Sequence, residues 1–245
     1  SVQLGIEHRL EPLDFRLTYN GSNVDYVSSV TTDNDDLDRT DGRVALRVGF
    51  EIDQGTSLFV EPSYNWKTYD RAVDRAGVLQ DNDGVEFLAG VTWDVSSVTF
   101  LEFALGYLRQ EFDDSALSTI QGPTLSARLI WNPSDLWTVT LNSRRTIQET
   151  ATPGQAGVLV TATDAKIDYE FLYNTIVSVS AAYADEDQGG SNQTDTRTGF
   201  GLKIRHLLNR NLYLQLDGSL IELSSTDPAA EFEAFTSSIR LGVNM

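Results

Sequence analysis

The sequence lacks the residues on which several classes of protein depend. It has no cysteine, which excludes disulfide frameworks and thiolate metal sites, and only two histidines, which argues against multi-histidine metal centres and histidine-based catalysis. No apolar run approaches the roughly 18 residues that a membrane helix needs. Basic residues number 18 against 36 acidic ones, so the formal net charge is −18. A chain with this negative charge is a poor partner for nucleic acid. We also expect no cofactor.

What the sequence does have is alternation of apolar and polar residues along almost its whole length. Between residues 98 and 111, Leu101 and Phe103 fall on one face of an extended chain and Glu102 falls on the other. A period of two is typical of a β-strand with one apolar face. The same pattern recurs at residues 44–53, 85–94, 165–173 and 235–244. No window has a convincing helical period.

The connections between the expected strands alternate in length. The short ones carry the Asp, Asn, Gly, Pro and Ser that tight turns need. They are residues 11–14, 53–56, 94–97, 132–135, 174–175 and 208–211. The long ones are roughly residues 29–41, 71–83, 114–122, 150–157, 188–194 and 226–230. This plan is typical of an outer-membrane barrel, with short periplasmic turns and long extracellular loops.

Strand length and aromatic placement favour the same fold. Many expected strands run about 10–14 residues, enough to cross a bilayer at a barrel's tilt, whereas strands of soluble proteins usually run about 5–6. Aromatic residues near strand ends resemble interfacial girdles; they are Trp66, Trp93, Trp131, Trp137, Tyr107, Tyr173 and Tyr183. We predict a single all-β domain over residues 1–245, an antiparallel up-and-down transmembrane β-barrel of about 12–16 strands. A soluble β-sandwich or lipocalin-like barrel is the alternative.

Three stretches of the sequence resemble a known family. They are residues 81–114, 129–150 and 202–222, with the words GYLRQ, WNP and LLNRNL. They resemble the outer-membrane β-barrel family called putative β-barrel porin 2, and the similarity covers most of the chain from about residue 42. The resemblance implies a location in the bacterial outer membrane and a loose association with surface polysaccharide export loci. It implies no catalytic residues.

Two features depart from the usual pattern of such barrels. The chain ends Val243–Asn244–Met245 rather than in an aromatic residue. We also count about thirteen strands, whereas bacterial single-chain barrels have an even number. If the last strand ends in the periplasm, alternation makes the first strand, at residues 2–10, start outside. We therefore expect that an N-terminal segment is missing from this sequence, or that residues 1–28 are not two full strands.

If the apolar face contacts lipid, the opposite face lines the lumen. The basic residues expected there are Arg9, Arg16, Arg47, Lys67, Arg128, Arg144, Lys166, Lys203, Arg205 and Arg240. The acidic residues expected there are Glu7, Glu51, Glu61, Glu86, Glu102, Asp168, Glu170 and Asp217. Charges persist in such a wall only where water or an opposite charge reaches them. Two interpretations remain open: a ladder of ion pairs that closes the lumen, or a polar conduit whose opposed rows orient ions or sugars.

The loops expected outside are acidic. Residues 33–38 (DNDDLD) and 81–84 (DNDG) are similar to calcium loops in composition, but neither has the full spacing with a later bidentate Glu. We therefore interpret them as solvated acidic loops rather than metal sites. Negative loops would repel anions and tolerate cations, or bridge to lipopolysaccharide through divalent ions. The expected partners are outer-membrane lipid and lipopolysaccharide, with surface polysaccharide or export machinery as further candidates and homo-oligomerisation left open.

The favoured function is porin-like passage of small hydrophilic solutes or polysaccharide through a polar lumen. The alternative is a plugged structural barrel that anchors surface polymer or partner proteins through its acidic loops. A membrane hydrolase would need a serine near His206 on the lipid face. No serine has a base and an orienting group at a plausible register, so we do not expect an enzyme.

Overall fold

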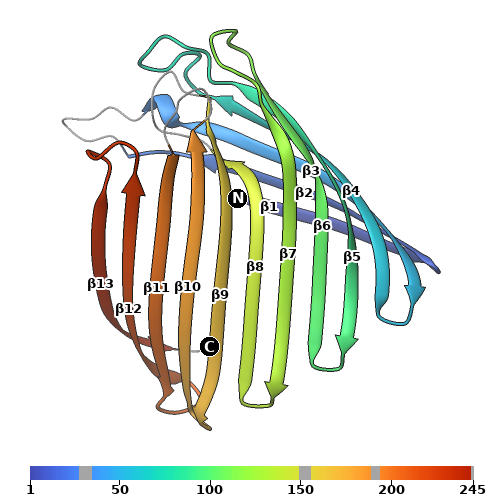
Figure 1. Ribbon diagram of the computed structural model, residues 1–245, viewed down its shortest axis with the longest axis vertical. Coiled ribbons are helices and arrows are strands. Elements are labelled where there is room, and N and C mark those ends of the chain that lie inside the picture. Colours follow the sequence, from blue (N-terminus) through green and yellow to red (C-terminus); the bar gives the residue numbers. More distant parts are fainter. Residues whose placement is uncertain (28–34, 149–155, 189–193, 244–245) are drawn as a thin grey trace.

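The computed structural model describes residues 1–27, 35–148, 156–188 and 194–243. Within these ranges the chain forms one antiparallel sheet of thirteen strands in sequence order, and one short 3-10 helix, η1 (Asp35–Leu37) (Figure 1). The strands are β1 (Val2–Leu10), β2 (Leu13–Val24), β3 (Arg39–Asp53), β4 (Thr56–Tyr69), β5 (Asn82–Ser96), β6 (Thr99–Phe112), β7 (Ile120–Ser134), β8 (Trp137–Gln148), β9 (Val158–Leu172), β10 (Thr175–Gln188), β11 (Thr194–Leu207), β12 (Leu212–Ser225) and β13 (Phe232–Val243).

The strand plan confirms the predicted all-β, up-and-down architecture. Consecutive strands pair with one another throughout, with tight turns at one end of the sheet and the longer connections at the other (Figure 1). Three predicted turns are displaced along the chain: those expected at 94–97, 132–135 and 174–175 lie at 97–98, 135–136 and 173–174. At the second of these, β7 continues through Pro133 to Ser134. The β7–β8 register shifts between Trp131 and Ser134, so a bulge accommodates the proline, which has no N–H to donate to the ladder.

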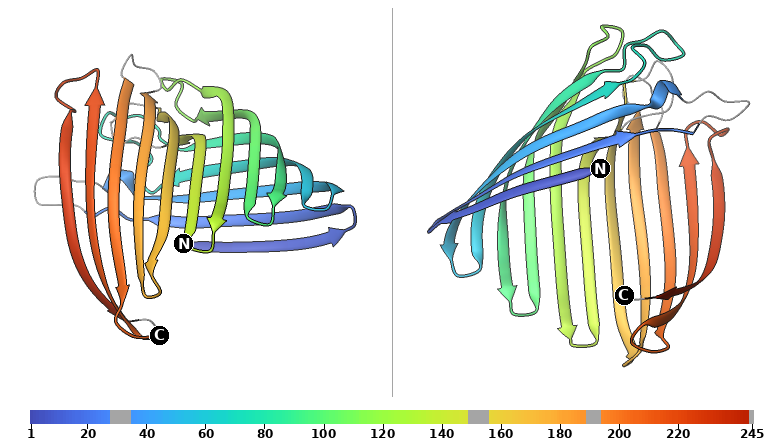
Figure 2. Two further views of the ribbon diagram at one scale, coloured as in Figure 1. Left: turned by 60° about the horizontal axis from the view of Figure 1, so that its bottom comes forward. Right: turned by 180° about the vertical axis from the view of Figure 1, so that it is seen from behind.

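The sheet does not close into a complete barrel. Among the described residues, β1 pairs with β2 alone and β13 pairs with β12 alone. Because thirteen strands alternate in direction, the first and the last run the same way, and they cannot complete an antiparallel ladder with each other. The sheet is strongly curved and coiled, and its two edge strands lie apart (Figure 2).

One face of the sheet is apolar and exposed. Leu46 on β3, Val179 on β10 and Ile239 on β13 are 39%, 52% and 77% exposed. Large exposed apolar surfaces of this kind mark contact with a membrane or a partner, and strands of 12–15 residues are long enough to cross the apolar band of a bilayer. No helix within the described ranges is long and apolar enough to span a membrane.

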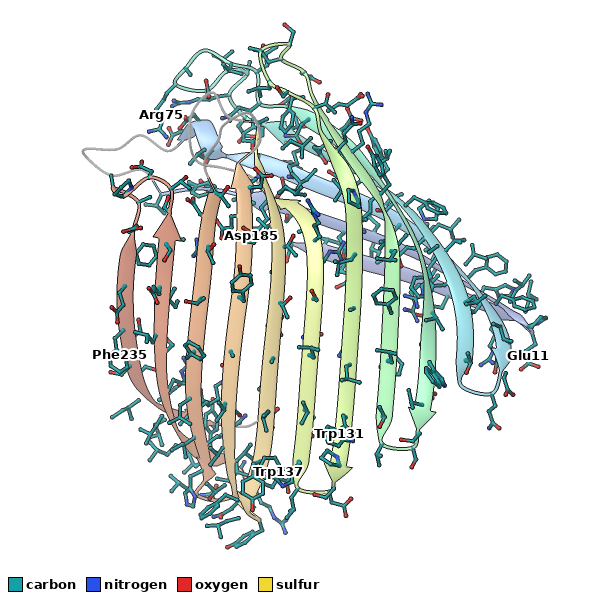
Figure 3. All side chains as sticks on the ribbon, in the orientation of Figure 1. Glu11, Arg75, Trp131, Trp137, Asp185 and Phe235 are labelled. Carbon is teal, nitrogen blue, oxygen red and sulfur yellow. The ribbon has the colours of Figure 1, made fainter. Side chains whose placement is uncertain are left out.

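Aromatic side chains gather near both ends of this apolar face. Trp131 and Trp137 lie beside the tight turns (Figure 3), and the Trp137 ring stacks on that of Tyr169 with centroids 4.3 Å apart. Near the longer connections, the ring of Trp66 stacks on that of Tyr64 at 5.7 Å. Aromatic belts at two heights are typical of a barrel whose rings lie at the two membrane interfaces.

Candidate functional site: the polar face of the sheet

The strand register brings every predicted lumen residue to one face. For example, Glu51, Glu102 and Arg128 lie in one row across the sheet, because Glu51 pairs with Ser57, Ser57 with Thr92, Thr92 with Glu102, and Glu102 with Arg128. Side chains separated by two residues on a strand share a face, so the same assignment extends along each strand. Ion pairs between strands that are not neighbours identify this face as the concave one.

The polar face has two regions that differ in how their charges are paired. We call the polar-face side chains of β3–β8 the bridged wall, because several of its ion pairs join strands that are not adjacent. We call those of β9–β13 the unbridged wall, because its polar contacts join only residues of one strand or of neighbouring strands. Both names refer to the described residues of those strands.

Arg47 makes one of the two connections that span three strands among the described residues of the bridged wall. From β3 it reaches Glu102 on β6, with Nη1–Oε1 and Nη2–Oε2 distances of 3.2 and 3.0 Å, and it donates to Thr92 Oγ1 at 2.8 Å. A two-pronged arginine–carboxylate contact is among the stronger polar interactions in proteins. Glu61 on β4 adds a second carboxylate at 3.8 Å.

Beneath Arg47 lies a small apolar cluster on the same face. The guanidinium carbon is 3.4 Å from the ring centroid of Phe59, and Phe59 packs with Leu88 and Ala104, both 4% exposed or less. The ring lies across Gly90, where an added Cβ would meet Phe59 Cζ at 2.7 Å. The guanidinium of Arg47 therefore stacks on the ring of Phe59, and this contact holds the arginine side chain close to the sheet.

Glu86 on β5 is a shared acceptor. Its Oε2 lies 3.0 Å from Arg43 Nη2 on β3 and 3.2 Å from Arg144 Nη2 on β8, and its Oε1 accepts from Thr124 Oγ1 at 3.1 Å. The Glu86 side chain is only 10% exposed. A carboxylate that is buried to this extent is stable because its oxygens are satisfied by several donors.

Contacts in the unbridged wall stay local. Lys166 Nζ lies 2.8 Å from Asp168, two residues along β9, and Ser178 on the next strand donates to Asp168 at 2.5 Å. Asp217 accepts from Gln215 on its own strand, at 2.9 Å to the nearer oxygen, and from Ser238 on β13 at 3.3 Å. Many of the remaining side chains on this face are small: Ala162, Ser180, Ala182, Gly199, Gly201 and Ser219.

The other predicted lumen residues divide among these patterns. Arg9 pairs with Glu51 at 2.5 Å and Arg16 with Glu7 at 2.6 Å, next to the bridged wall. Arg205 lies 4.0 Å from the ring centroid of Tyr213. The remainder, Lys67, Arg128, Glu170, Lys203 and Arg240, lie on the same face by register.

Sequence reasoning missed Arg43 and Thr124, two of the partners of Glu86. Arg43 sits two residues before Ala45 and four before Arg47, so extending the alternation by one position would have found it. Thr124 carries no comparable signal. Its Oγ1 also lies 2.6 Å from the carbonyl oxygen of Arg145, so the single hydroxyl hydrogen is shared between this oxygen and Glu86. That contact follows the point where β7–β8 pairing stops, at Ser126 and Arg144.

The acidic connections are held by contacts with neighbouring connections. Asp35 lies 3.0 Å from Arg71 Nη2, and Asp36 lies 2.9 Å from Arg75 Nε. Asp81 accepts from the backbone N–H of Tyr69 at 2.8 Å. In the part of the chain that the structure describes, no three His, Asp or Glu side chains gather as a metal site would require. Residues 33 and 34 of the predicted acidic loop lie outside that part.

His206 lies on the apolar face beside the turn at 208–211. Its Nδ1 is 2.8 Å from Thr175 Oγ1, the residue directly opposite it on β10. That hydrogen bond satisfies one ring nitrogen of His206 on the apolar face, next to a turn.

Sequence comparison identifies one family and no curated relative. The sequence model of a family described as Putative beta-barrel porin 2 matches residues 1–245. No curated protein matches the sequence at the significance required.

Solved structures share the fold. A chain of the FpvAI–pyocin S2 complex is 9% identical with a TM-score of 0.56, over 97% of this chain and 43% of that one. The copper transporter OprC is 12% identical with a TM-score of 0.53, over 95% and 47%. The monoaromatic hydrocarbon channel CymD is 10% identical with a TM-score of 0.41, over 99% and 82%. This chain thus spans less than half of the first two, and the likeness to those two concerns the fold alone.

Proposed function

The chain belongs to the putative beta-barrel porin 2 family of the bacterial outer membrane, and we propose that it passes small hydrophilic solutes through a polar lumen. The observation that supports this is the division of the two faces. Polar and charged side chains share one face on all thirteen strands, while the opposite face is apolar and exposed. A wall of this kind keeps water on one side and lipid on the other.

The path that we propose follows the unbridged wall. Many of its polar-face side chains are small, and the contacts described above for this wall join residues of one strand or of neighbouring strands. The bridged wall, in contrast, holds its long side chains in ion pairs against the sheet. Solutes would therefore move along β9–β13 and face the ion pairs of β3–β8.

Single-channel conductance of the purified protein in planar bilayers, in KCl at two ionic strengths, tests the proposal. We expect steady steps of conductance. Two neighbouring substitutions on β10 provide matched variants: Ser180→Trp adds bulk on the polar face and should lower the conductance severalfold, whereas Val179→Trp adds the same bulk on the lipid face and should leave it unchanged. Absence of conductance from protein that is folded, as judged by heat-modifiable gel mobility, would overturn the proposal.

Passage of polysaccharide is a larger-solute version of the same proposal. Liposome swelling with sugars of increasing length separates the two versions, since a small-solute pore should exclude all but the shortest sugars. Contact of the apolar face with outer-membrane lipid is part of both.

The contacts between acidic connections favour one second candidate, a plugged structural barrel. The Asp35–Arg71 and Asp36–Arg75 pairs link the connection before β3 to the one after β4, as a fixed cover would require. Under that alternative, Arg71→Gln with Arg75→Gln would turn a silent barrel into a conducting one. Under the channel proposal the same double variant changes conductance little.

A further inference from the structure

The cation of Arg128 stands apart from the other charges of the bridged wall. Its side chain is exposed, whereas the side chain of Arg47 is 15% exposed. Across the ladder, the residue opposite Arg128 is Glu102, so the register alone would pair the two. Instead both carboxylate oxygens of Glu102 bind Arg47 from β3. In the part of the chain described here, Arg128 has no ion pair and no side-chain hydrogen bond.

The ladder neighbour of Arg128 on β8 is uncharged and also engaged elsewhere. On β8, Asn142 lies directly opposite and donates to Asp164 Oδ2 at 2.9 Å. Arg128 lines a cavity of about 420 Å³ together with Arg16, Arg47, Asp14 and Glu102. Arg16 pairs with Glu7. Asp14, which lines the same cavity from β2, lies against Gly49 on β3, three strands away from β6 and four from β7.

We infer that Arg128 is an anion-binding residue of the lumen, and that Arg47 creates it by occupying the carboxylate that would otherwise neutralise it. An unpaired guanidinium in a water-filled cavity presents several N–H donors to an anion. The ligands that fit are small anions: a halide, or a solute bearing a carboxylate or phosphate. This inference deepens the proposed function, since it names a residue that discriminates between solutes in the same lumen.

The two arginines have different roles in this arrangement. Arg128 faces the solute, while Arg47 is a positioning residue that holds Glu102 away. Loss of either should therefore weaken attraction of anions, by two different routes. Arg128→Gln removes the cation, and Arg47→Gln releases Glu102 to pair with it. Glu102→Gln should act in the other direction, because it removes a negative charge and leaves both arginines available.

Reversal potentials in a KCl gradient measure this effect. We expect Arg128→Gln to lower the chloride-to-potassium permeability ratio about two- to threefold, the change expected for one unit charge roughly 7 Å from a passing ion in water. Arg47→Gln should lower the ratio as well, and Glu102→Gln should raise it. The matched control is Arg109→Gln, which removes the same charge from the opposite face of the sheet, where Arg109 pairs with Glu111. An unchanged ratio in Arg128→Gln, with normal conductance, would refute the inference and leave the channel proposal intact.

A second measurement does not require conductance. Phenylglyoxal modifies accessible arginines, and mass spectrometry of the folded protein in detergent locates the adducts. We expect Arg128 to react faster than Arg47, and inorganic phosphate to slow its modification selectively. If phosphate slowed the reaction of Arg128 no more than that of Arg109, the inference would fail, whether or not the protein forms a channel.

Discussion

The bridged and unbridged walls contain similar residues and use them differently. In the bridged wall, Arg47 and Arg144 reach carboxylates on strands that are not their neighbours. In the unbridged wall, Lys166 and Asp217 find partners on their own strand or the next one. The difference shows that charge content alone does not decide how the charges of a wall are paired. Similar residues form long connections between distant strands in one wall and local contacts in the other.

The two walls also differ in how closely neighbouring atoms approach their glycines. At Gly106 in the bridged wall, an added Cβ would collide with the carbonyl oxygen of Phe87. At Gly199 in the unbridged wall, the nearest atom to an added Cβ is the Cβ of Ala182 at 3.7 Å, an ordinary contact distance. The bridged wall therefore depends on close backbone approach, and the unbridged wall does not.

Alanine substitution at these two glycines gives the largest expected effect. Gly106→Ala should destabilise the barrel by about 1–3 kcal/mol, because the backbone of β5 must move, and Gly199→Ala should change stability by less than about 0.5 kcal/mol. Urea unfolding in detergent, followed by heat-modifiable mobility, measures both. Equal stabilities for the two variants would mean that the walls are packed alike.

Removing one carboxylate from each wall gives the next effect. Glu86→Gln leaves the guanidinium groups of Arg43 and Arg144 without their shared charged acceptor, and should cost about 1–3 kcal/mol. Glu170→Gln removes an exposed carboxylate of the unbridged wall, and should cost less than about 0.5 kcal/mol. The same unfolding assay applies. A loss at Glu170 as large as that at Glu86 would contradict the distinction between the walls.

The smallest effect concerns pH and the connections beyond the bridged wall. Asp114 accepts from the backbone N–H groups of Ala116 at 2.8 Å and Leu79 at 3.0 Å, which hold the pKa of its carboxyl below the usual 3.8. A depressed carboxyl pKa means that this stabilisation is complete above pH about 4 and is lost as the pH falls through the lower folded-state pKa.

Amide hydrogen-exchange protection of Leu79 is the measurement. We expect protection to fall only at pH values below about 4 in the wild-type protein, as Asp114 takes up a proton. In Asp114→Asn, the amide exchange protection of both Leu79 and Ala116 should be weaker at neutral pH. It should show no further fall below pH about 4. A step that persists in the variant would assign the effect to another group.

Much of the fold follows from period-two alternation, because each residue has only two faces to choose between. That rule places Glu86, Arg128 and Lys203 on one face, and Val179 and Ile239 on the other, as the structure has them. Turn residues locate the ends of most strands for the same local reason. Pro133 led to a turn being predicted too early in the chain, because a bulge near a strand end tolerates a proline as readily as a turn does.

The partners of the charges could not be predicted in the same way. Alternation predicts that Arg47 and Glu102 share a face, but their contact crosses from β3 to β6 and depends on sheet curvature and on the apolar cluster under Arg47. Local sequence carries no measure of curvature. For the same reason the sequence could not distinguish Arg128, which is left without a carboxylate, from Arg144, which has one.

The placement of the four tryptophans gives the protein a built-in optical probe. Trp93, Trp131 and Trp137 lie at the tight-turn end of the apolar face, and Trp66 lies at the other end. Indole fluorescence shifts to the blue and is quenched by brominated acyl chains when a ring enters lipid. Insertion can therefore be followed without an added label, and the order in which the two ends become quenched reports which end of the barrel crosses the membrane first.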